Sequence, residues 1–321
     1  MPIFESRTRA AQPELIRTIS YPYRQHRRDS QNVPKRTSFS RNTVFVSVGI
    51  PLLIFSWVFL ARGDGADSQA SKDTSSAAAL TAPEPIKSLD YTSMDATMNG
   101  VIAANPEMDI GIATVDIKTG DTKTYGVEEV FVAASTAKLL TAIAYLRDVE
   151  QGKHSLTENI GGRSAQSALE ALIVDSDNQA WEQLNTVAMS YEELATYAAS
   201  IGFTDYNAKR NTTTATSLAT LLGNLYQRKL LNEKHTSLLL SYMERAKEVD
   251  YITSTAPEGT KVYHKPGYLS DRVHDAAIID NIERPYVLVI FTKARTGVYD
   301  NVAGGSVFTK AANATYNTFL K

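Results

Sequence analysis

The 321-residue chain contains no cysteine, which excludes disulfides, thiolate zinc sites and a cysteine nucleophile. That absence does not by itself place the protein in or out of an oxidising compartment. Histidine is also scarce: there are five, and no two of them show a metal-ligand spacing such as His-Glu-x-x-His. The sequence therefore predicts no metal site and no cofactor.

Net charge is small, −2 at pH 7, but it is unevenly distributed. Of 33 basic and 35 acidic residues, nine and three lie in residues 1–42, which leaves 24 and 32 beyond that point and a net charge of −8 there. A mildly acidic main part argues against a nucleic-acid partner. Residues 1–42 also contain several prolines and many Ser, Thr and Gln, so we expect a disordered basic tail.

Charged residues are absent from Thr43 to Ala61, a run of nineteen residues between two arginines. This length is enough to cross the hydrocarbon core of a bilayer. A cleaved signal peptide is the alternative, but 42 residues precede the run, and it is longer than a typical signal-peptide core. Because basic residues precede it and Asp64 and Asp67 follow it, we expect a single-pass helix in the cell membrane, with a cytoplasmic N-terminus and an extracytoplasmic remainder.

Composition divides the chain into four predicted segments. Residues 1–42 are the basic disordered cytoplasmic tail, and residues 43–61 are the transmembrane helix. Residues 62–87 are rich in Gly, Ala, Ser, Asp and Pro, which is typical of a flexible linker. Residues 88–321 form the predicted folded domain, in which no internal repeat is evident.

Hydrophobic periodicity in residues 88–321 predicts both helices and strands. The expected elements are a helix over 89–104, strands over 109–117 and 122–127, a buried helix after Ser135, a largely helical block over 164–245, strands over 261–264, 273–280 and 286–293, and a helix over 307–320. This order predicts an α+β fold in which N- and C-terminal helices flank an antiparallel sheet and an all-helical lobe is inserted midway.

Ser135 and Lys138 form the only Ser-x-x-Lys of the chain, at the start of a run rich in Ala and Leu. Residues three apart on a helix share a face, which brings the lysine amine toward the serine hydroxyl. A desolvated lysine can take the proton that keeps a serine from being a good nucleophile. The alternative is an ordinary core helix with Ser135 as its N-cap and Lys138 facing solvent.

Two further clusters are less specific when each is taken alone. Ser176-Asp-Asn178 lies near a predicted helix start, where Ser176 or Asp175 could simply be a cap. Lys265-Pro-Gly267 comes at the end of a predicted strand, and by itself this tripeptide is an ordinary turn.

Taken together and in this order, Ser-x-x-Lys, Ser-Asp-Asn and Lys-x-Gly resemble the motifs of the penicillin-recognising serine enzymes, the class A β-lactamases and penicillin-binding proteins. The resemblance covers nearly all of residues 88–321, including the strand order and the helical lobe. It also includes Asn211–Leu222, which looks like the helix that follows the Ω-loop of class A enzymes.

The resemblance implies three catalytic residues. Ser135 would attack a carbonyl and become acylated, and Lys138 would accept or relay its proton. Ser176 would link Lys138 to Lys265 and pass a proton to the leaving nitrogen. The resemblance also implies four substrate-binding residues. Asn178 would hydrogen-bond the substrate amide, and Lys265 would attract the substrate carboxylate. Gly267 would let the substrate approach the strand closely, and the N–H of Tyr268 would form part of the oxyanion hole. The second oxyanion-hole N–H would be that of Ser135 itself.

The sequence departs from this family at two places. Class A β-lactamases carry an Ω-loop glutamate that activates the deacylating water, whereas residues 203–210 contain no glutamate, and we assign no such role to Asp205. Loss of a positioned base costs about 10²–10⁴ in rate, so slow deacylation is expected. The second departure is Pro266, where the family usually has a Thr or Ser whose hydroxyl helps to hold the substrate carboxylate. Arg272 either compensates for this loss or is a surface residue of a hairpin.

The sequence therefore predicts a membrane-anchored, extracytoplasmic serine hydrolase that works through an acyl-serine intermediate. Its expected substrate is a β-lactam, a D-alanyl peptide of peptidoglycan, or a related amide or ester. The missing glutamate favours a peptidase-like or slow acyl-transfer activity over a drug-resistance enzyme. The alternatives are an esterase and a non-catalytic module that binds cell-envelope material through the same cleft, because a fold does not determine its function.

Overall fold

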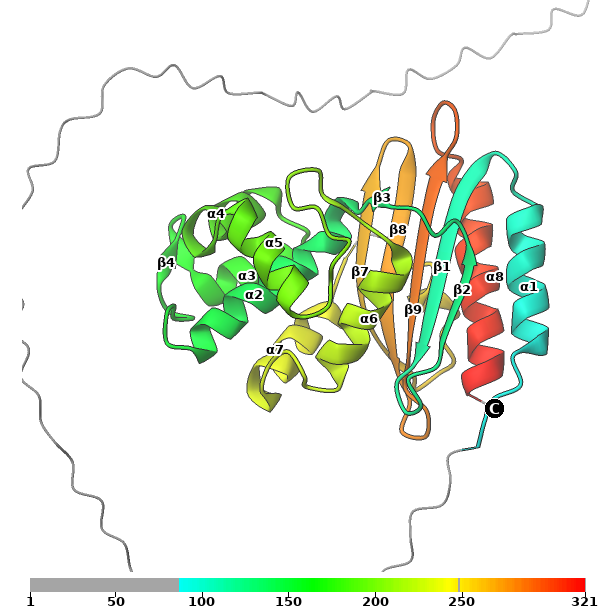
Figure 1. The fold of residues 1–321 in the computed structure, drawn as a ribbon, viewed down its shortest axis with the longest axis horizontal. Coiled ribbons are helices and arrows are strands. Elements are labelled where there is room, and N and C mark those ends of the chain that lie inside the picture. The colour runs from blue at the N-terminus through cyan, green and yellow to red at the C-terminus, as the bar shows by residue number, and fades with distance from the viewer. Residues whose placement is uncertain (1–86, 248, 321) are drawn as a thin grey trace, which may run out of the picture. The chain divides into compact units, whose positions relative to one another are not determined.

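The computed structural model describes residues 87–247 and 249–320. At its centre lies a five-stranded antiparallel sheet with the strand order β2-β1-β9-β8-β7 (Figure 1). The strands are β1 (Met108–Asp116), β2 (Thr122–Gly126), β7 (Lys261–Leu269), β8 (Arg272–Asp280) and β9 (Tyr286–Ala294). Because β1 pairs with β9, the sheet joins the two ends of the folded region, and the helical lobe is inserted between β2 and β7 as expected.

Helices α1 (Thr92–Ala103) and α8 (Asn301–Phe319) lie side by side against one face of the sheet (Figure 1). Side chains of a strand alternate between its two faces. Accordingly, Leu288 and Ile290 of β9 pack toward α8, whereas Val289 and Phe291 pack toward the helical lobe. All four are fully buried, so both faces of β9 belong to the hydrophobic core.

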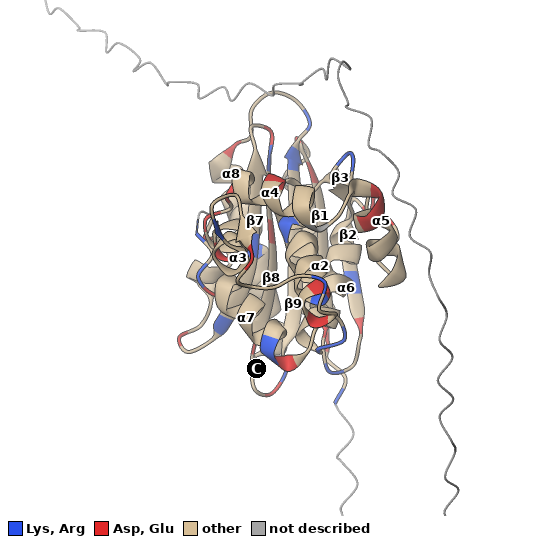
Figure 2. Cartoon of the chain, turned by 90° about the vertical axis from the view of Figure 1, so that its left-hand side faces the viewer, with Lys and Arg blue, Asp and Glu red and all other residues tan. Residues whose placement is uncertain are grey.

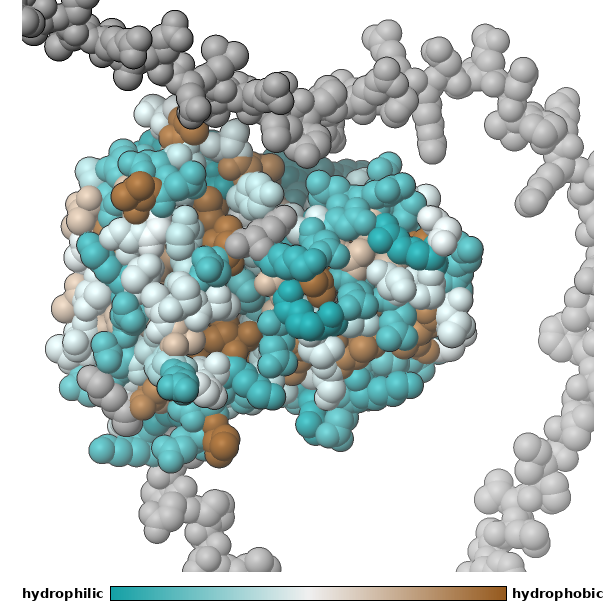
Figure 3. Space-filling model, turned by 180° about the vertical axis from the view of Figure 1, so that it is seen from behind, coloured by the Kyte–Doolittle hydropathy of each residue, from teal (hydrophilic) through white to brown (hydrophobic). Residues whose placement is uncertain are grey.

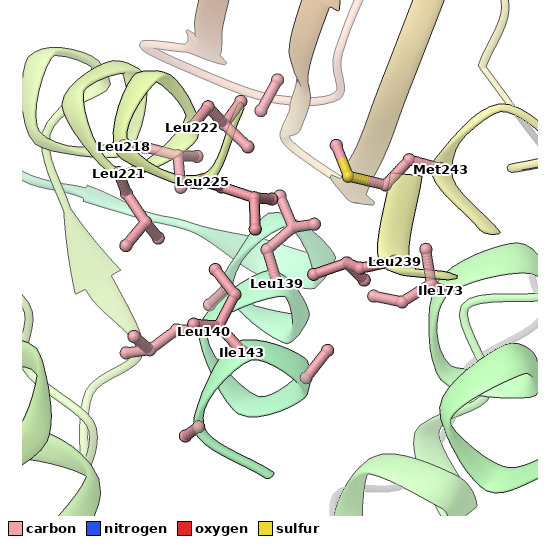
Figure 4. Packing of buried hydrophobic residues seen from close by; sticks show 14 of the residues in the cluster. Leu139, Leu140, Ile143, Ile173, Leu218, Leu221, Leu222, Leu225, Leu239 and Met243 are labelled. Atoms are coloured by element: carbon pink, nitrogen blue, oxygen red, sulfur yellow. The ribbon is translucent and has the colours of Figure 1, made fainter. Parts of the chain in front are cut away.

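The helical lobe covers the other face. It contains α2 (Lys138–Glu150), α3 (Ala165–Val174), α4 (Asn178–Ala188), α5 (Tyr191–Ser200), α6 (Ala215–Tyr226) and α7 (Glu233–Met243). Figure 4 shows Leu139, Leu140 and Ile143 of α2 packed among leucines of α6 and near Leu239 and Met243 of α7. Burial of each such side chain contributes roughly 1.5–3 kcal/mol. This packing fixes α2, and with it the position of the residues that precede Lys138.

Short elements connect the sheet to the lobe. The ribbon of β3 (Phe131–Val132) and β6 (Thr212–Thr213) leads into the 3₁₀ helix η1 (Ala134–Ala137). A second ribbon joins β4 (Asn159–Ile160) to β5 (Arg163–Ser164), and a second 3₁₀ helix, η2, spans Thr253–Thr255. Basic and acidic residues are interspersed along the ribbon of the lobe (Figure 2), and Glu192 and Glu193 lie in the first turn of α5.

The last helix begins earlier than predicted, at Asn301 rather than at residue 307. Asp300 caps it, because its carboxylate accepts hydrogen bonds from the N–H groups of Val302 and Ala303 at 2.8 and 3.1 Å. Gly304 and Gly305 weaken the helical signal in the sequence. Packing explains Gly304, since a Cβ atom there would lie 2.1 Å from the Tyr299 hydroxyl oxygen.

Strand β7 is longer than predicted and contains the whole Lys265-Pro-Gly267 tripeptide, so the interpretation of this tripeptide as a turn is wrong. β7 is an edge strand. The carbonyl of Pro266 accepts a hydrogen bond from the Lys265 ammonium at 2.9 Å, so the backbone of Pro266 faces away from β8. A proline in this orientation removes no hydrogen bond from the sheet, and the strand can continue through it.

Within residues 87–247 and 249–320, no helix has the length and apolar character needed to cross a membrane. The predicted span over residues 43–61, the tail before it and all but the last residue of the predicted linker lie outside the described residues.

Candidate active site

The backbone around Ser135 is held by hydrogen bonds to a distant loop. Ser135 lies in η1, and the N–H of Ala133 donates to the carbonyl of Asn211 at 2.8 Å. The Asn211 side chain donates to the carbonyl of Ala134 at 3.0 Å. Ala134 has a φ of 49°, a left-handed conformation that costs a non-glycine residue roughly 1–3 kcal/mol. Asn211 therefore holds a strained residue directly before the candidate nucleophile.

Lys138 is fully buried, so the alternative in which it faces solvent is wrong. Its ammonium group donates to the Asn178 side-chain oxygen at 2.7 Å, to the Ser176 hydroxyl at 3.2 Å and to the Ser176 carbonyl. The same nitrogen lies 5.3 Å from the centre of the Trp181 ring, a cation–π contact. These contacts join the first sequence motif to the second at the point where α2 begins.

Ser176 lies between two lysines. Its hydroxyl oxygen accepts from Lys138 at 3.2 Å and from Lys265 at 3.0 Å, and Lys265 is also fully buried. A hydroxyl has two acceptor lone pairs and one proton to donate. When both lone pairs face ammonium groups, the Ser176 proton points away from the lysines. This arrangement suits a hydroxyl that relays a proton to a bound substrate.

The helix cap next to Ser176 is a different residue from those that the sequence suggested. Asp177 caps α4, because its carboxylate accepts from Gln179 N at 2.8 Å and from Ala180 N at 3.2 Å. Asp175 instead pairs with Lys247 at 2.6 Å. Ser176 has a φ of 55°, so its backbone conformation is strained as well. Partial burial raises the pKa of Asp177, but the hydrogen bond from Arg163 and the two backbone donors outweigh it and lower that pKa.

Gly267 brings β7 into direct contact with η1. A Cβ atom at this position would lie 2.7 Å from the backbone nitrogen of Ser135 and 2.9 Å from that of Thr136. Only glycine allows the strand to pass this close. Tyr268 follows at once on the same strand, so its N–H comes next to the contact between the Ser135 backbone and the strand. The position suits the predicted pair of oxyanion-hole donors.

His274 of β8 contacts the short strand β3, which leads to Ser135. It is completely buried, and its Nε2 atom lies 2.9 Å from the carbonyl of Val132, the last residue of β3. Its Nδ1 atom lies 2.8 Å from the carbonyl of Val273 and 3.2 Å from Thr292 N. Burial lowers the pKa of His274 to about 4, so the ring is neutral near pH 7 and carries a single proton.

The stability of the fold is expected to fall in mild acid because of His274. Burial lowers the pKa of this histidine from its ordinary value of 6.5 to about 4 in the folded protein, so its contribution is complete above pH 6.5 and is lost as the pH falls through 4. The loss amounts to at most about 3 kcal/mol. Denaturant unfolding between pH 4 and 7 measures it. His274→Gln, which keeps a donor for Val132, should show a weaker pH dependence in this range. An unchanged slope would contradict the assignment.

His264, a neighbouring histidine, should change the stability with pH in the opposite direction and in a higher pH range. Burial lowers the pKa of His264, but the Asp275 carboxylate, whose oxygens lie 3.1 Å from Nδ1, outweighs it and raises that pKa above 6.5. The stabilisation from this pair is complete below pH 6.5 and is lost as the pH rises through the raised pKa. The two histidines can therefore be separated by the pH range in which each acts.

Neither Asp205 nor Arg272 replaces a group that the family pattern has and this chain lacks, because other residues hold both side chains by hydrogen bonds. Asp205 accepts from the Thr213 hydroxyl at 2.9 Å and from the N–H and hydroxyl of Thr214 at 3.1 and 2.5 Å. It therefore fastens β6 to the start of α6. Arg272 donates from Nε and Nη2 to both carboxylate oxygens of Asp271, at 2.8 and 2.6 Å. Arg272 lies at the β7–β8 hairpin, as one of the two interpretations has it, but its side chain is only 11% exposed, so it is not a surface residue.

The structure thus brings together the residues of all three motifs, and their individual roles remain predictions. Sequence analysis did not identify Asn211, His274 or Asp177 as supports of the site. Asp177 stands inside the second motif, so its capping role was available from the preference of aspartate for helix starts. The contacts of Asn211 and His274 join residues 77 and 142 positions apart in the chain, and no local pattern predicts such contacts.

Comparisons with known proteins agree with the fold described above. A family model described as "Beta-lactamase enzyme family" matches residues 93–319. A search among curated proteins gave no match. Among solved structures, a β-lactamase from Chitinophaga pinensis superposes with a TM-score of 0.64 at 17% identity, covering 70% of this chain and 98% of the other. A β-lactamase from Xanthomonas campestris gives 0.65 at 22% identity, with 70% and 96% covered.

A third similar structure is a mutant of PBP-A in an acyl-enzyme complex with penicillin G. It superposes with a TM-score of 0.65 at 21% identity and covers 73% of this chain and 98% of its own. Identities this low establish the common fold and nothing finer. The family model is the stronger finding, because it matches most of the chain, from the second residue of α1 to the last residue of α8. The chain belongs to the β-lactamase enzyme family.

Proposed function

We propose that this protein is a membrane-anchored, extracytoplasmic serine hydrolase that forms an acyl-enzyme at Ser135 with a β-lactam or a D-alanyl amide and releases the acyl group slowly. The observation that carries the proposal is the Ser176 hydroxyl, which lies 3.2 Å from the Lys138 nitrogen and 3.0 Å from the Lys265 nitrogen. This chain of groups connects the base next to the nucleophile with the side of the cleft formed by β7.

The proposed reaction uses these groups in order. Lys138, in its neutral form, takes the proton of Ser135 as the serine oxygen attacks the substrate carbonyl. The N–H groups of Ser135 and Tyr268 stabilise the developing oxyanion. The proton then passes through Ser176 to the leaving nitrogen, and the carbon–nitrogen bond breaks. Asp205 is held by three donors, so it is not free to activate water, which supports slow deacylation.

The non-catalytic alternative fits the site less well. Burial of a lysine is costly unless its charge is paired or hydrogen-bonded. The site buries two lysine side chains completely and directs both at one serine. A module that only binds its ligand would gain little from this arrangement. A site that moves protons needs amines with easily changed charge.

Burst kinetics test the proposed reaction. Full-length protein in detergent micelles is mixed with a chromogenic cephalosporin, and product is followed from milliseconds to hours. We expect a burst of about one product per protein molecule followed by a much slower steady rate, because loss of a positioned base costs about 10²–10⁴ in rate. Ser135→Ala should show no burst. Rapid turnover without a burst would contradict slow deacylation, and a burst in Ser135→Ala would contradict the nucleophile.

Membrane anchoring is a separate part of the proposal and rests on the uncharged run over residues 43–61. Such a helix holds a protein in a bilayer against high salt. We expect detergent, and not salt, to extract the full-length chain from membranes, and deletion of residues 43–61 to release it. Release of the intact chain by salt alone would argue against a spanning helix.

A further inference from the structure

Ser176 lies in a strained turn between α3 and α4, with a φ of 55°. A residue keeps such a conformation only where the surrounding structure holds it. Lys138 donates to the carbonyl and the hydroxyl of Ser176, and Lys265 donates to the hydroxyl. A further set of contacts comes from the segment that follows α7, residues 245–247, which we call the clamp.

The clamp binds the end of α3, from which the strained turn starts. The N–H of Lys247 donates to the carbonyl of Val174 at 2.9 Å, and the Lys247 ammonium donates to the Asp175 carboxylate at 2.6 Å. Arg245 pairs with Glu170 of α3 at 2.7 Å. Val174 is buried, and a buried carbonyl without a partner is costly. The backbone hydrogen bond therefore fixes the clamp against α3.

The clamp is also tied to β7. The N–H of Ala246 donates to the carbonyl of Met243 at 3.3 Å, so the clamp continues from the last turn of α7, which packs against β7. The ring of His264 on β7 hydrogen-bonds the backbone of Ala246, and the two carboxylate oxygens of Asp275 hold the same ring at 3.1 Å. His264 directly precedes Lys265 on the strand.

We propose that the clamp positions the Ser176 hydroxyl against Lys265, and that Lys247 is its positioning residue. The clamp contacts the chain neighbour of each partner: Asp175 directly before Ser176, and His264 directly before Lys265. The two partners come from different parts of the fold, the helical lobe and the sheet, so a segment bound to both sets their separation. Lys247 acts through Ser176.

The inference rests on the proposed function and deepens its last proton transfer. In that reaction Ser135 loses its proton to Lys138, and its oxygen bonds to the acyl carbon. The carbon–nitrogen bond then breaks as the proton passes through Ser176 to the departing nitrogen. A leaving group that departs as a stable anion, such as p-nitrophenolate, needs no such proton. A displaced Ser176 should therefore slow acylation by an amide and spare acylation by an activated ester.

Two acyl donors with the same phenylacetamido side chain test this difference: penicillin G and the p-nitrophenyl ester of phenylacetylglycine. The readout is the ratio of their second-order acylation rate constants with the full-length protein, from intact mass for penicillin and from nitrophenolate release for the ester. We expect Lys247→Met to lower the ratio about two- to fivefold, the usual worth of an exposed ion pair. Lys247→Arg, which keeps the pair, should restore it. An unchanged ratio in Lys247→Met, or equal slowing by both donors, would overturn the inference.

Lys209→Met is the matched control. Lys209 pairs with Glu192 at 2.7 Å, and the two side chains are 69% and 70% exposed, against 67% and 50% for Lys247 and Asp175. Hydrophilic residues predominate on the surface of the helical lobe in the view of Figure 3, so ion pairs of this kind are comparable. Lys209→Met should leave the ratio unchanged, and a drop equal to that of Lys247→Met would contradict the inference.

Ser176→Ala separates this inference from the proposed function. It should lower the ratio by more than Lys247→Met does, because it removes the hydroxyl itself. If Ser176→Ala slows both donors equally, the proton relay of the proposed function fails, and the inference fails with it. If Ser176→Ala lowers the ratio while Lys247→Met leaves it unchanged, only the inference fails.

Discussion

Replacement of Lys138 by methionine is expected to slow the acylation of Ser135 by a factor of about 10²–10⁴, the usual contribution of a positioned general base. Lys138 is the amine that contacts Ser176 and Asn178 at the start of α2. Methionine fills a similar volume but accepts no proton. The measurement is the second-order rate constant of acylation by a penicillin, followed by intact mass, in Lys138→Met and in the unmodified protein.

A second variant separates the base from the charge. Lys138→Arg keeps a cation, but a guanidinium does not give up its proton in proteins, so the rate should stay as low as in Lys138→Met. Recovery of acylation in Lys138→Arg would show that Lys138 acts by its charge alone. Because Lys138 is buried and hydrogen-bonded, both variants need a denaturant unfolding curve, and only variants that remain folded at the assay temperature are compared.

Gly267→Ala should be the most damaging change that adds a single methyl group. The added Cβ atom would stand 2.7 Å from Ser135 N and 2.9 Å from Thr136 N, so β7 or η1 must move. Either movement separates the two N–H donors proposed for the oxyanion, and loss of one such donor costs about 10²–10³ in rate. The acylation rate constant is again the measurement.

Gly100→Ala is the matched control for this change. Gly100 is an exposed residue of α1, and a Cβ atom there meets nothing within 4 Å. In a helix interior this substitution is worth up to about 1 kcal/mol in favour of alanine, so Gly100→Ala should acylate normally and unfold at a slightly higher denaturant concentration. Normal acylation in Gly267→Ala would mean that the oxyanion is not held at this contact.

Local spacing predicted only that Ser135 and Lys138 lie on one turn. That the second and third motifs join them in one site was implied by the resemblance to the penicillin-recognising serine enzymes, because each of those motifs taken alone is an ordinary cap or turn. The hydrophobic runs of β8 and β9 predicted strands to within a residue or two, because both faces of these strands are buried.

The remainder depends on contacts that the chain makes at long range. β7 continues through Pro266 only because it is an edge strand, and α8 tolerates Gly304 only because Tyr299 fills the space beside it. Likewise, His274 becomes a support of the nucleophile through the carbonyl of Val132, on a strand that pairs elsewhere. Local propensity contains none of these facts, since each is set by tertiary packing.

The most direct test of the account is intact mass spectrometry of the full-length protein over time with a penicillin, beside Ser135→Ala. We predict a mass increase of one penicillin on the unmodified protein, localised by peptide mapping to the peptide that contains Ser135, and its persistence after excess penicillin is removed. An equal increase on Ser135→Ala would contradict the nucleophile. An adduct that forms and disappears rapidly would contradict slow deacylation and reveal a base other than Asp205.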